Sequence, residues 1–330
     1  MAATPAMAIP KVELHLHLDC GPSYAAVAAL APGTTLAEHR ARHMFVSRCT
    51  DLADFLGRTR ANVELMQDER GLRIVVDDLF DQLQRDGVAY AEVRFAPLLH
   101  TTGGLDPRRV VEIVEAATVA ASAATGVGAR LILCALRHFS PVESMATARL
   151  AAEMAGSAVV GFDLAGDEAG FGLDAHEAAF RYAAEEGVAL TAHAGEACGP
   201  ASVWDTLRRL GPSRIGHGVR SIEDDGLVAH LRDTGIHLEV CPTSNVVTNV
   251  VDDLAAHPVD RLLRAGVPLG ISTDMRGTGV SLAVEHELLS ATFGWTDDDL
   301  RTVTRAAIDA SFAPDELKTD LRLRLDGATT

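Results

Sequence analysis

Lysine is almost absent from this chain. Its 330 residues contain only Lys11 and Lys318, and 29 basic residues in total face 46 acidic ones, which gives a net charge of −17. Proteins that bind nucleic acid non-specifically neutralise phosphates with Lys and Arg, so this balance argues against a nucleic-acid partner. Apolar residues are not scarce: they make up 48% of the chain, which excludes a disordered protein.

Cysteine and long apolar runs are also scarce. Five cysteines in 330 residues are too few for a disulfide scaffold, and their odd number leaves at least one free thiol, which suits a reducing cytosol. No run of eighteen apolar residues occurs, so we expect no membrane span. Residues 1–11 lack a basic stretch followed by an apolar one, so we expect no signal peptide and predict a cytoplasmic protein.

Short aliphatic runs alternate with stretches of helical spacing along the chain. The predicted strands are 12–18, 89–95, 129–137, 159–165, 188–194, 214–219, 237–242 and 268–273. The predicted helices between them are 108–124, 146–155, 174–186, 201–210, 223–233 and 257–265. Strands that alternate with helices indicate a parallel sheet.

Eight such strands without a composition break predict one α/β domain over 1–330, a closed TIM (β/α)₈ barrel. The long gap 19–88 predicts a helical insertion after the first strand, with a helix at 51–65, and 297–325 predicts two extra C-terminal helices. An open doubly wound sheet is the alternative. Its dinucleotide-binding form needs a Gly-x-Gly-x-x-Gly turn after the first strand, which 18–24 lacks.

Titratable residues gather at the carboxyl ends of the predicted strands, where barrels carry their chemistry. They are His15, His17, Asp19, Asp163, His193, Glu196, His217 and Asp274. His15 and His17 are two residues apart, so both imidazoles point to one face of a strand. Each residue alone has an ordinary structural explanation, such as a hydrogen-bonded core histidine or a helix-capping Asp274. Together, at one rim, they predict a functional site.

Three of these histidines and Asp274 supply the nitrogen and oxygen ligands that zinc binds without any thiolate. Iron, manganese or cobalt accept similar ligands, so the metal stays open. A bound metal makes water nucleophilic at neutral pH, and a nearby carboxylic acid can then protonate the electrophile. Glu196 follows His193 by three residues and is placed for that role, although it could simply begin a helix. His217 could hold or deprotonate the water.

Six motifs in order then resemble the adenosine deaminase family of the amidohydrolase superfamily. They are PKVELHLHLD at 10–19, FDLAGDE at 162–168, TAHAGE at 191–196, RIGHGV at 214–219, EVCPTSN at 239–245 and STD at 272–274. The ordered set runs through nearly the whole chain, whereas a single His-x-His would be weak evidence.

The resemblance implies a barrel with one Zn²⁺ per subunit, whose ligands would be His15, His17, His193 and Asp274. Glu196 would protonate purine N1, and His217 would orient and deprotonate the attacking water, with Asp274 also accepting a bond from it. Gly166 would meet purine N3 through its N–H, Asp19 would contact the sugar hydroxyls, and the segment around Leu52, Phe55 and Leu56 would form an apolar lid. The implied substrate is a free nucleoside, adenosine or 2′-deoxyadenosine.

One position departs from the family pattern. The family usually has a second Asp directly after the ligand Asp, bonding purine N7, and this chain has Met275 there. A thioether is a poor replacement as a hydrogen-bonding group. Met275 therefore keeps two alternatives open: a modified 6-amino nucleoside, such as a 7-deaza compound or aminodeoxyfutalosine, and a zinc-binding barrel that senses a ligand without catalysis.

Overall fold

The computed structural model describes residues 9–327, and its eight strands confirm the predicted sheet. They are β1 Lys11–His17, β2 Val88–Phe95, β3 Gly128–Leu136, β4 Val159–Ala165, β5 Ala189–Ala194, β6 Arg214–His217, β7 His237–Val240 and β8 Leu269–Ile271. All neighbouring pairs from β1 to β8 are parallel and follow chain order. The sheet closes where the N–H of His17 donates to the carbonyl of Asp274 at 2.8 Å and that of Asp274 to His15 at 3.0 Å. The alternative of an open sheet is therefore wrong.

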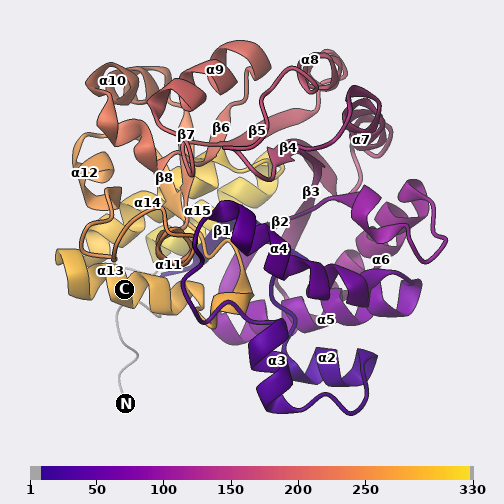
Figure 1. Ribbon diagram of the computed structural model, residues 1–330. Helices are drawn as coiled ribbons and strands as arrows, with labels where there is room; N and C mark the ends of the chain where they lie inside the picture. Colours follow the sequence, from indigo (N-terminus) through magenta and orange to yellow (C-terminus); the bar gives the residue numbers. More distant parts are fainter. Residues whose placement is uncertain (1–8, 328–330) are drawn as a thin grey trace, which may run out of the picture.

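Helices surround this barrel, as Figure 1 shows. Those that follow the strands are α5 Glu69–Asp86, α6 Pro107–Thr125, α7 Pro141–Glu153, α8 Glu177–Glu185, α9 Pro200–Leu210, α10 Asp225–Thr234, α11 Pro242–Val247, α12 Val259–Arg264 and α13 Leu282–Phe293. α7 begins five residues before the predicted start because Ser140 and Glu143 form a capping box around Pro141. Gly126 and Gly211 end their helices in the left-handed conformation that favours glycine.

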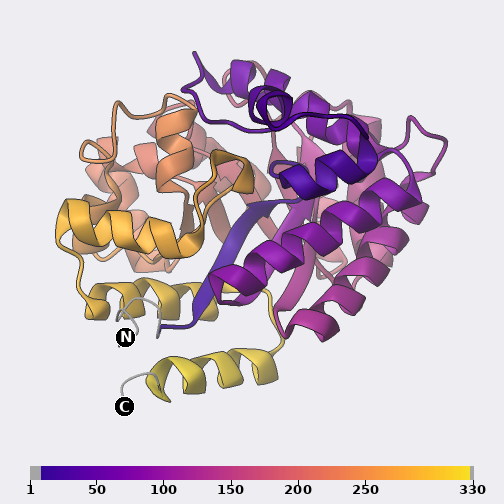
Figure 2. The ribbon, with the colours of Figure 1, turned by 90° about the horizontal axis from the view of Figure 1, so that it is seen from below.

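The two predicted additions to the barrel are both present. The insertion after β1 contains α2 Tyr24–Leu30, α3 Leu36–Arg42, α4 Leu52–Val63 and the 3₁₀ turn η1 Glu64–Met66, and α4 matches the helix expected at 51–65. The C-terminal pair is α14 Asp297–Ala310 and α15 Asp315–Gly327. The insertion and α15 lie on opposite sides of the barrel (Figure 2). Short 3₁₀ turns complete the fold at Pro97–His100, Val219–Glu223 and Arg276–Thr278.

The barrel interior holds a buried ion-pair layer as well as aliphatic side chains. Arg214 pairs with Glu92 at 2.6 Å and with Glu239 at 2.7 Å, and all three side chains are at most 1% exposed. Buried charges persist only when they are paired in this way. None of the helices within residues 9–327 has the length and apolar character that a membrane crossing requires.

Candidate active site and metal centre

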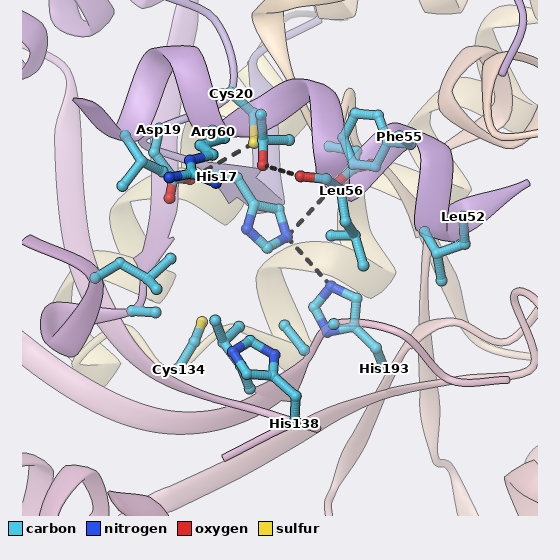
Figure 3. Close-up of a pocket in the computed structure, with 18 of the residues that line it drawn as sticks. His17, Asp19, Cys20, Leu52, Phe55, Leu56, Arg60, Cys134, His138 and His193 are labelled. Carbon is cyan, nitrogen blue, oxygen red and sulfur yellow. Dashed lines mark hydrogen bonds and ion pairs between the residues drawn. The ribbon is translucent and has the colours of Figure 1, made fainter. Parts of the chain in front are cut away.

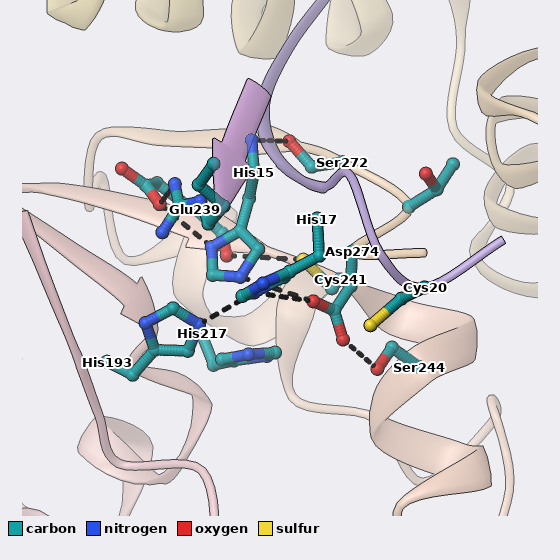
Figure 4. A network of polar contacts seen from close by, with 12 residues as sticks. His15, His17, Cys20, His193, His217, Glu239, Cys241, Ser244, Ser272 and Asp274 are labelled. Atoms are coloured by element: carbon teal, nitrogen blue, oxygen red, sulfur yellow. Dashed lines mark hydrogen bonds and ion pairs between the residues drawn. The ribbon is translucent and has the colours of Figure 1, made fainter. Parts of the chain in front are cut away.

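Three histidines and an aspartate meet at the carboxyl end of the barrel. His17 Nε2 lies 3.2 Å from His193 Nε2 and 3.4 Å from Asp274 Oδ1. His15 Nε2 lies 3.3 Å from the same Asp274 oxygen. Figure 4 shows these side chains converging from β1, β5 and the loop after β8. The structure thus links the four predicted metal ligands in one contiguous cluster, in which His15, His17 and Asp274 form a group that could hold a metal ion.

The hydrogen bonds around these ligands test whether they fit a cation. His15 Nδ1 lies 2.8 Å from Glu239 Oε2, and His193 Nδ1 lies 3.1 Å from the carbonyl of Leu164, so both Nδ1 atoms carry the proton. Both Nε2 atoms are then bare acceptors, and His15 Nε2 is buried without a hydrogen-bond partner. Its 3.3 Å contact with Asp274 joins two acceptors, which a bound cation would bridge. Three imidazole nitrogens and one carboxylate oxygen fit Zn²⁺ or a similar divalent metal.

A second layer of charge orients these ligands. Arg94 donates to Asp163 at 3.0 Å and to Glu239 at 2.5 Å, and Asp163 lies 3.2 Å from His193 Nδ1. Burial alone would raise the pKa of Glu239, but Arg94 and Arg214 hold it well below its usual range. Carboxylates behind metal-binding histidines fix the tautomer and raise ligand basicity. Sequence reasoning missed Glu239 and Arg94, although a charged residue within a buried strand is the signal that marks them.

Two of the site residues adopt a backbone conformation that is uncommon outside glycine. His217 has φ 59° and Asp274 has φ 65°, both in the left-handed region. His217 ends β6 and Asp274 lies in the loop three residues after β8, so the chain turns sharply at both points. Such conformations cost free energy and tend to occur at functional sites.

The surroundings of Glu196 favour the protonated form of its carboxyl group. Its side chain is 5% exposed and lies 3.6 Å from His217 Nε2. Burial raises the pKa of Glu196 well above its usual value, and the charges of Asp274 and Glu168 raise it further. A protonated carboxyl beside a metal-ligand set is the arrangement a general acid needs.

Glu168 anchors the loop that presents Glu196. Its carboxylate accepts bonds from the N–H groups of Gly195 at 2.7 Å, Glu196 at 3.1 Å and Cys198 at 2.8 Å. The residue lies in the predicted FDLAGDE motif, but its role could not be read from the sequence because its partners are backbone groups.

We expect Glu168→Gln to narrow the pH range of activity from the alkaline side. Removing this neighbouring negative charge lowers the pKa of Glu196, so the proton donor is lost at a lower pH than in the wild type. The measurement is the pH profile of kcat. Asp167→Asn is the control, because Asp167 is a neighbouring carboxylate that accepts hydrogen bonds from Ala169 and Gly170 in its own loop. An unmoved alkaline limb in Glu168→Gln would contradict the electrostatic role.

Helix α11 and its C-cap touch all three predicted catalytic residues. Ser244 Oγ donates to Asp274 Oδ2 at 2.6 Å, and Asn245 Nδ2 lies 3.0 Å from His217 Nδ1. Thr248 Oγ1 donates to Glu196 Oε1 at 3.3 Å. The EVCPTSN motif therefore supplies positioning contacts as well as resemblance.

A cavity of about 270 Å³ opens beside the ligand cluster. Its walls include the predicted substrate residues Asp19 and Gly166 and the predicted lid residues Leu52, Phe55 and Leu56. Figure 3 shows the α4 side chains on one side of His17 and His193, with Cys134 and His138 on another. Gly166 has φ 101°, and a Cβ there would lie 3.2 Å from the N atom of Arg137, so its backbone can approach a ligand closely. The site is a largely apolar cleft with polar groups at one end.

Met275 is not part of the lining of this cleft. It is fully buried in an apolar cluster with Phe45, Phe55, Cys20 and Leu52, beneath the lid helix, and it is not among the described residues that line the cavity. The position that usually bonds purine N7 therefore offers no polar group to a substrate and instead packs against α4.

We expect Met275→Asp to destabilise the protein rather than to increase its activity on adenosine. The carboxylate would replace a thioether in an apolar cluster, and an uncompensated buried charge costs about 3 kcal/mol or more. Chemical denaturation measures the loss, with Met275→Leu as the volume-matched control, which we expect to cost less than about 1.5 kcal/mol. A rise in adenosine turnover with unchanged stability would show that position 275 faces the substrate.

Known proteins resemble this chain over nearly its whole length. The family profile described as adenosine deaminase matches residues 10–328. An adenine deaminase of Rhizobium rhizogenes is 36% identical over 326 residues, covering 96% of this chain and 99% of that protein. An adenosine deaminase of Clostridium acetobutylicum is 32% identical over 334 residues, covering 96% and 97%.

Solved structures also resemble this chain over nearly its whole length. An adenine deaminase from Arthrobacter aurescens superposes with a TM-score of 0.88 at 29% identity, covering 97% of this chain and 98% of that one. The Arabidopsis ADAL structure, which contains IMP, gives 0.87 at 28% with 98% of each chain covered. An amidohydrolase from Burkholderia ambifaria with bound Zn gives 0.87 at 25%, covering 98% and 94%.

Proposed function

The chain belongs to the adenosine deaminase family and is a hydrolase of a C–N bond in a 6-aminopurine, and from this premise we propose that it deaminates adenosine or 2′-deoxyadenosine. The products would be inosine or 2′-deoxyinosine and ammonia. The observation that carries the proposal is the buried Glu196, 3.6 Å from His217, at a cleft that also holds a metal-ligand set and, at Asp19, a carboxylate for a sugar.

His15, His17, His193 and Asp274 would hold a Zn²⁺ ion, whose Lewis acidity would make water nucleophilic at neutral pH. Glu196 would donate its proton to N1 of the purine as the water oxygen adds to C6. His217 lies beside Glu196 and would position that oxygen. Asp274 would take the proton that the water loses and pass it to the amino group, which leaves C6 as ammonia. The proton of the new C6 hydroxyl returns to Glu196, so that the product keeps a hydrogen on N1 and a carbonyl at C6.

Asp19 supports a nucleoside over a free base. Its side chain lines the cavity and is almost fully buried, and the Cys20 thiol near it at 3.5 Å is a weak donor. A buried carboxylate gains most from a strong donor, and a sugar hydroxyl would provide one. The apolar residues Leu52, Phe55 and Leu56 would cover the ribose ring.

The electrostatics support a nucleoside over a nucleotide. Arg60 lines the cavity, but its side chain is mostly exposed and pairs with Glu64 at 3.3 Å. With a net charge of −17, the protein gives a phosphate group little attraction.

Free adenine is the second candidate. It is favoured by the curated relatives named adenine deaminase, such as the Rhizobium rhizogenes protein. A base lacks the hydroxyls that would satisfy Asp19, so the two candidates differ in their dependence on that residue.

Ammonia release from a substrate panel tests the proposal. The panel contains adenosine, 2′-deoxyadenosine, adenine, AMP, 7-deazaadenosine and aminodeoxyfutalosine. We expect the two nucleosides to have the highest kcat/KM, and Asp19→Ala to lower it for adenosine while leaving adenine unchanged. A higher kcat/KM for adenine would establish the second candidate, and a preference for 7-deazaadenosine or aminodeoxyfutalosine would favour a modified nucleoside. If no substrate releases more ammonia with the wild type than with the Glu196→Gln control, the protein is a non-catalytic barrel.

A further inference from the structure

A chain of three buried hydrogen bonds ends on His217. The backbone N–H of Val259 donates to His257 Nδ1 at 3.1 Å. His257 Nε2 lies 3.1 Å from Asn245 Oδ1, and Asn245 Nδ2 lies 3.0 Å from His217 Nδ1. All four residues are at most 2% exposed, so bulk water does not compete for these groups.

The backbone donor at one end sets the proton positions along the chain. A peptide N–H can only donate, so His257 Nδ1 must accept and therefore carries no proton. In a neutral ring the proton is then on Nε2, which donates to the Asn245 oxygen. That contact fixes the orientation of the amide, which is otherwise ambiguous, and leaves its NH₂ group facing His217. His217 Nδ1 must accept this bond.

We propose that His257 and Asn245 are positioning residues that hold His217 in the tautomer with its proton on Nε2, so that a hydrogen-bond donor faces the reacting centre. The tautomer of His217 does not depend on the substrate, and only its effect on kcat rests on the proposed function.

Two consequences follow for His217. His217 belongs with His15 and His193 to a group that could hold a metal, but a protonated Nε2 cannot be a ligand. His217 is thereby separated from the four ligands. It would also donate a hydrogen bond to the attacking oxygen and stabilise its negative charge, which replaces the expectation that it removes the water proton.

Nitrogen NMR of Zn²⁺-loaded protein with ¹⁵N-labelled histidine tests the assignment directly. Protonated and bare ring nitrogens have well-separated shifts, and a His217→Gln sample identifies the His217 signals by their loss. We expect a protonated Nε2 and a bare Nδ1. A protonated Nδ1 in the wild type would overturn the proposal, whether or not the protein deaminates any nucleoside.

Two substitutions distinguish the effect of the hydrogen-bond chain from His257 through Asn245 to His217, called the relay, from an effect of altered packing. Asn245→Asp replaces the donor by an acceptor, so we expect His217 Nδ1 to become protonated. His257→Phe removes the group that orients Asn245, and we expect mixed tautomers at His217. The matched control is His43→Phe, because His43 and Asn62 form another buried His–Asn pair at 2.7 Å without a link to His217. This control should leave the His217 signals unchanged.

Kinetics give the second readout. We expect Asn245→Asp to lower kcat by about 100-fold, which is typical for the loss of a preorganised donor to a developing oxyanion. His257→Phe, which acts through Asn245, should lower kcat by roughly tenfold, with KM changed far less. An Asn245→Asp protein that keeps a bare Nδ1 at His217 would show that the relay does not set the tautomer.

Discussion

Glu196→Gln should lower kcat for adenosine by about a thousandfold while KM changes only a few-fold. The amide has nearly the same shape and can still donate a hydrogen bond to N1, so binding is retained. It cannot release a proton, so the ring nitrogen stays unprotonated when water adds to C6. The decay of adenosine absorbance in the ultraviolet measures the rate.

Two controls show whether this loss reports proton donation. Thr248→Val removes the hydroxyl that bonds Glu196 at 3.3 Å but leaves the acid in place, so a much smaller loss is expected. Metal content should be unchanged in both variants, because Glu196 is not among the four predicted ligands. A Glu196→Gln enzyme with more than a tenth of wild-type kcat would exclude Glu196 as the general acid.

The sequence was sufficient to predict the barrel because its signals are local. Aliphatic runs alternate with helical spacing eight times, and glycines such as Gly126 and Gly211 mark helix ends. The start of α7 was placed too late because Ser140 and Pro141 precede the periodic residues. Closure between β1 and β8 depends on residues 257 positions apart, and only the strand count indicated it.

The site was predictable where its residues project directly from strand ends. His15, His17, His193 and Asp274 were expected at one rim, and the structure brings them within 3.2–3.4 Å contacts. The supporting groups were missed because their partners are distant in the chain. Glu239 lies 224 residues from His15, so neither their contact nor the buried layer below it is visible as a sequence pattern.

Met275 shows the limit of reading a substitution from a family pattern. Its place in the sequence suggested a changed base contact, whereas its side chain packs beneath α4 with Phe45 and Phe55. The direction of a side chain at a strand end depends on the local backbone, and Asp274 before it has φ 65°.

Asp274→Asn should abolish both metal binding and deamination. The amide cannot supply the anionic oxygen, and its NH₂ group would instead donate to the bare Nε2 atom of His15, which lies 3.3 Å from Asp274 Oδ1. We expect bound zinc to fall from one per chain to near zero and kcat to fall more than a thousandfold. Elemental analysis after gel filtration gives the metal content.

Asn is the appropriate replacement because position 274 has φ 65°, where Asn is tolerated and Ala is strained. Ser244→Ala is the matched control: it removes the 2.6 Å bond to Asp274 Oδ2 but keeps the carboxylate, so zinc should remain. Chelated wild-type protein should regain activity when Zn²⁺ is added, whereas Asp274→Asn should not, because its ligand set lacks the only carboxylate. Stoichiometric zinc in Asp274→Asn would show that the cation is held elsewhere, and the ligand assignment would then be wrong.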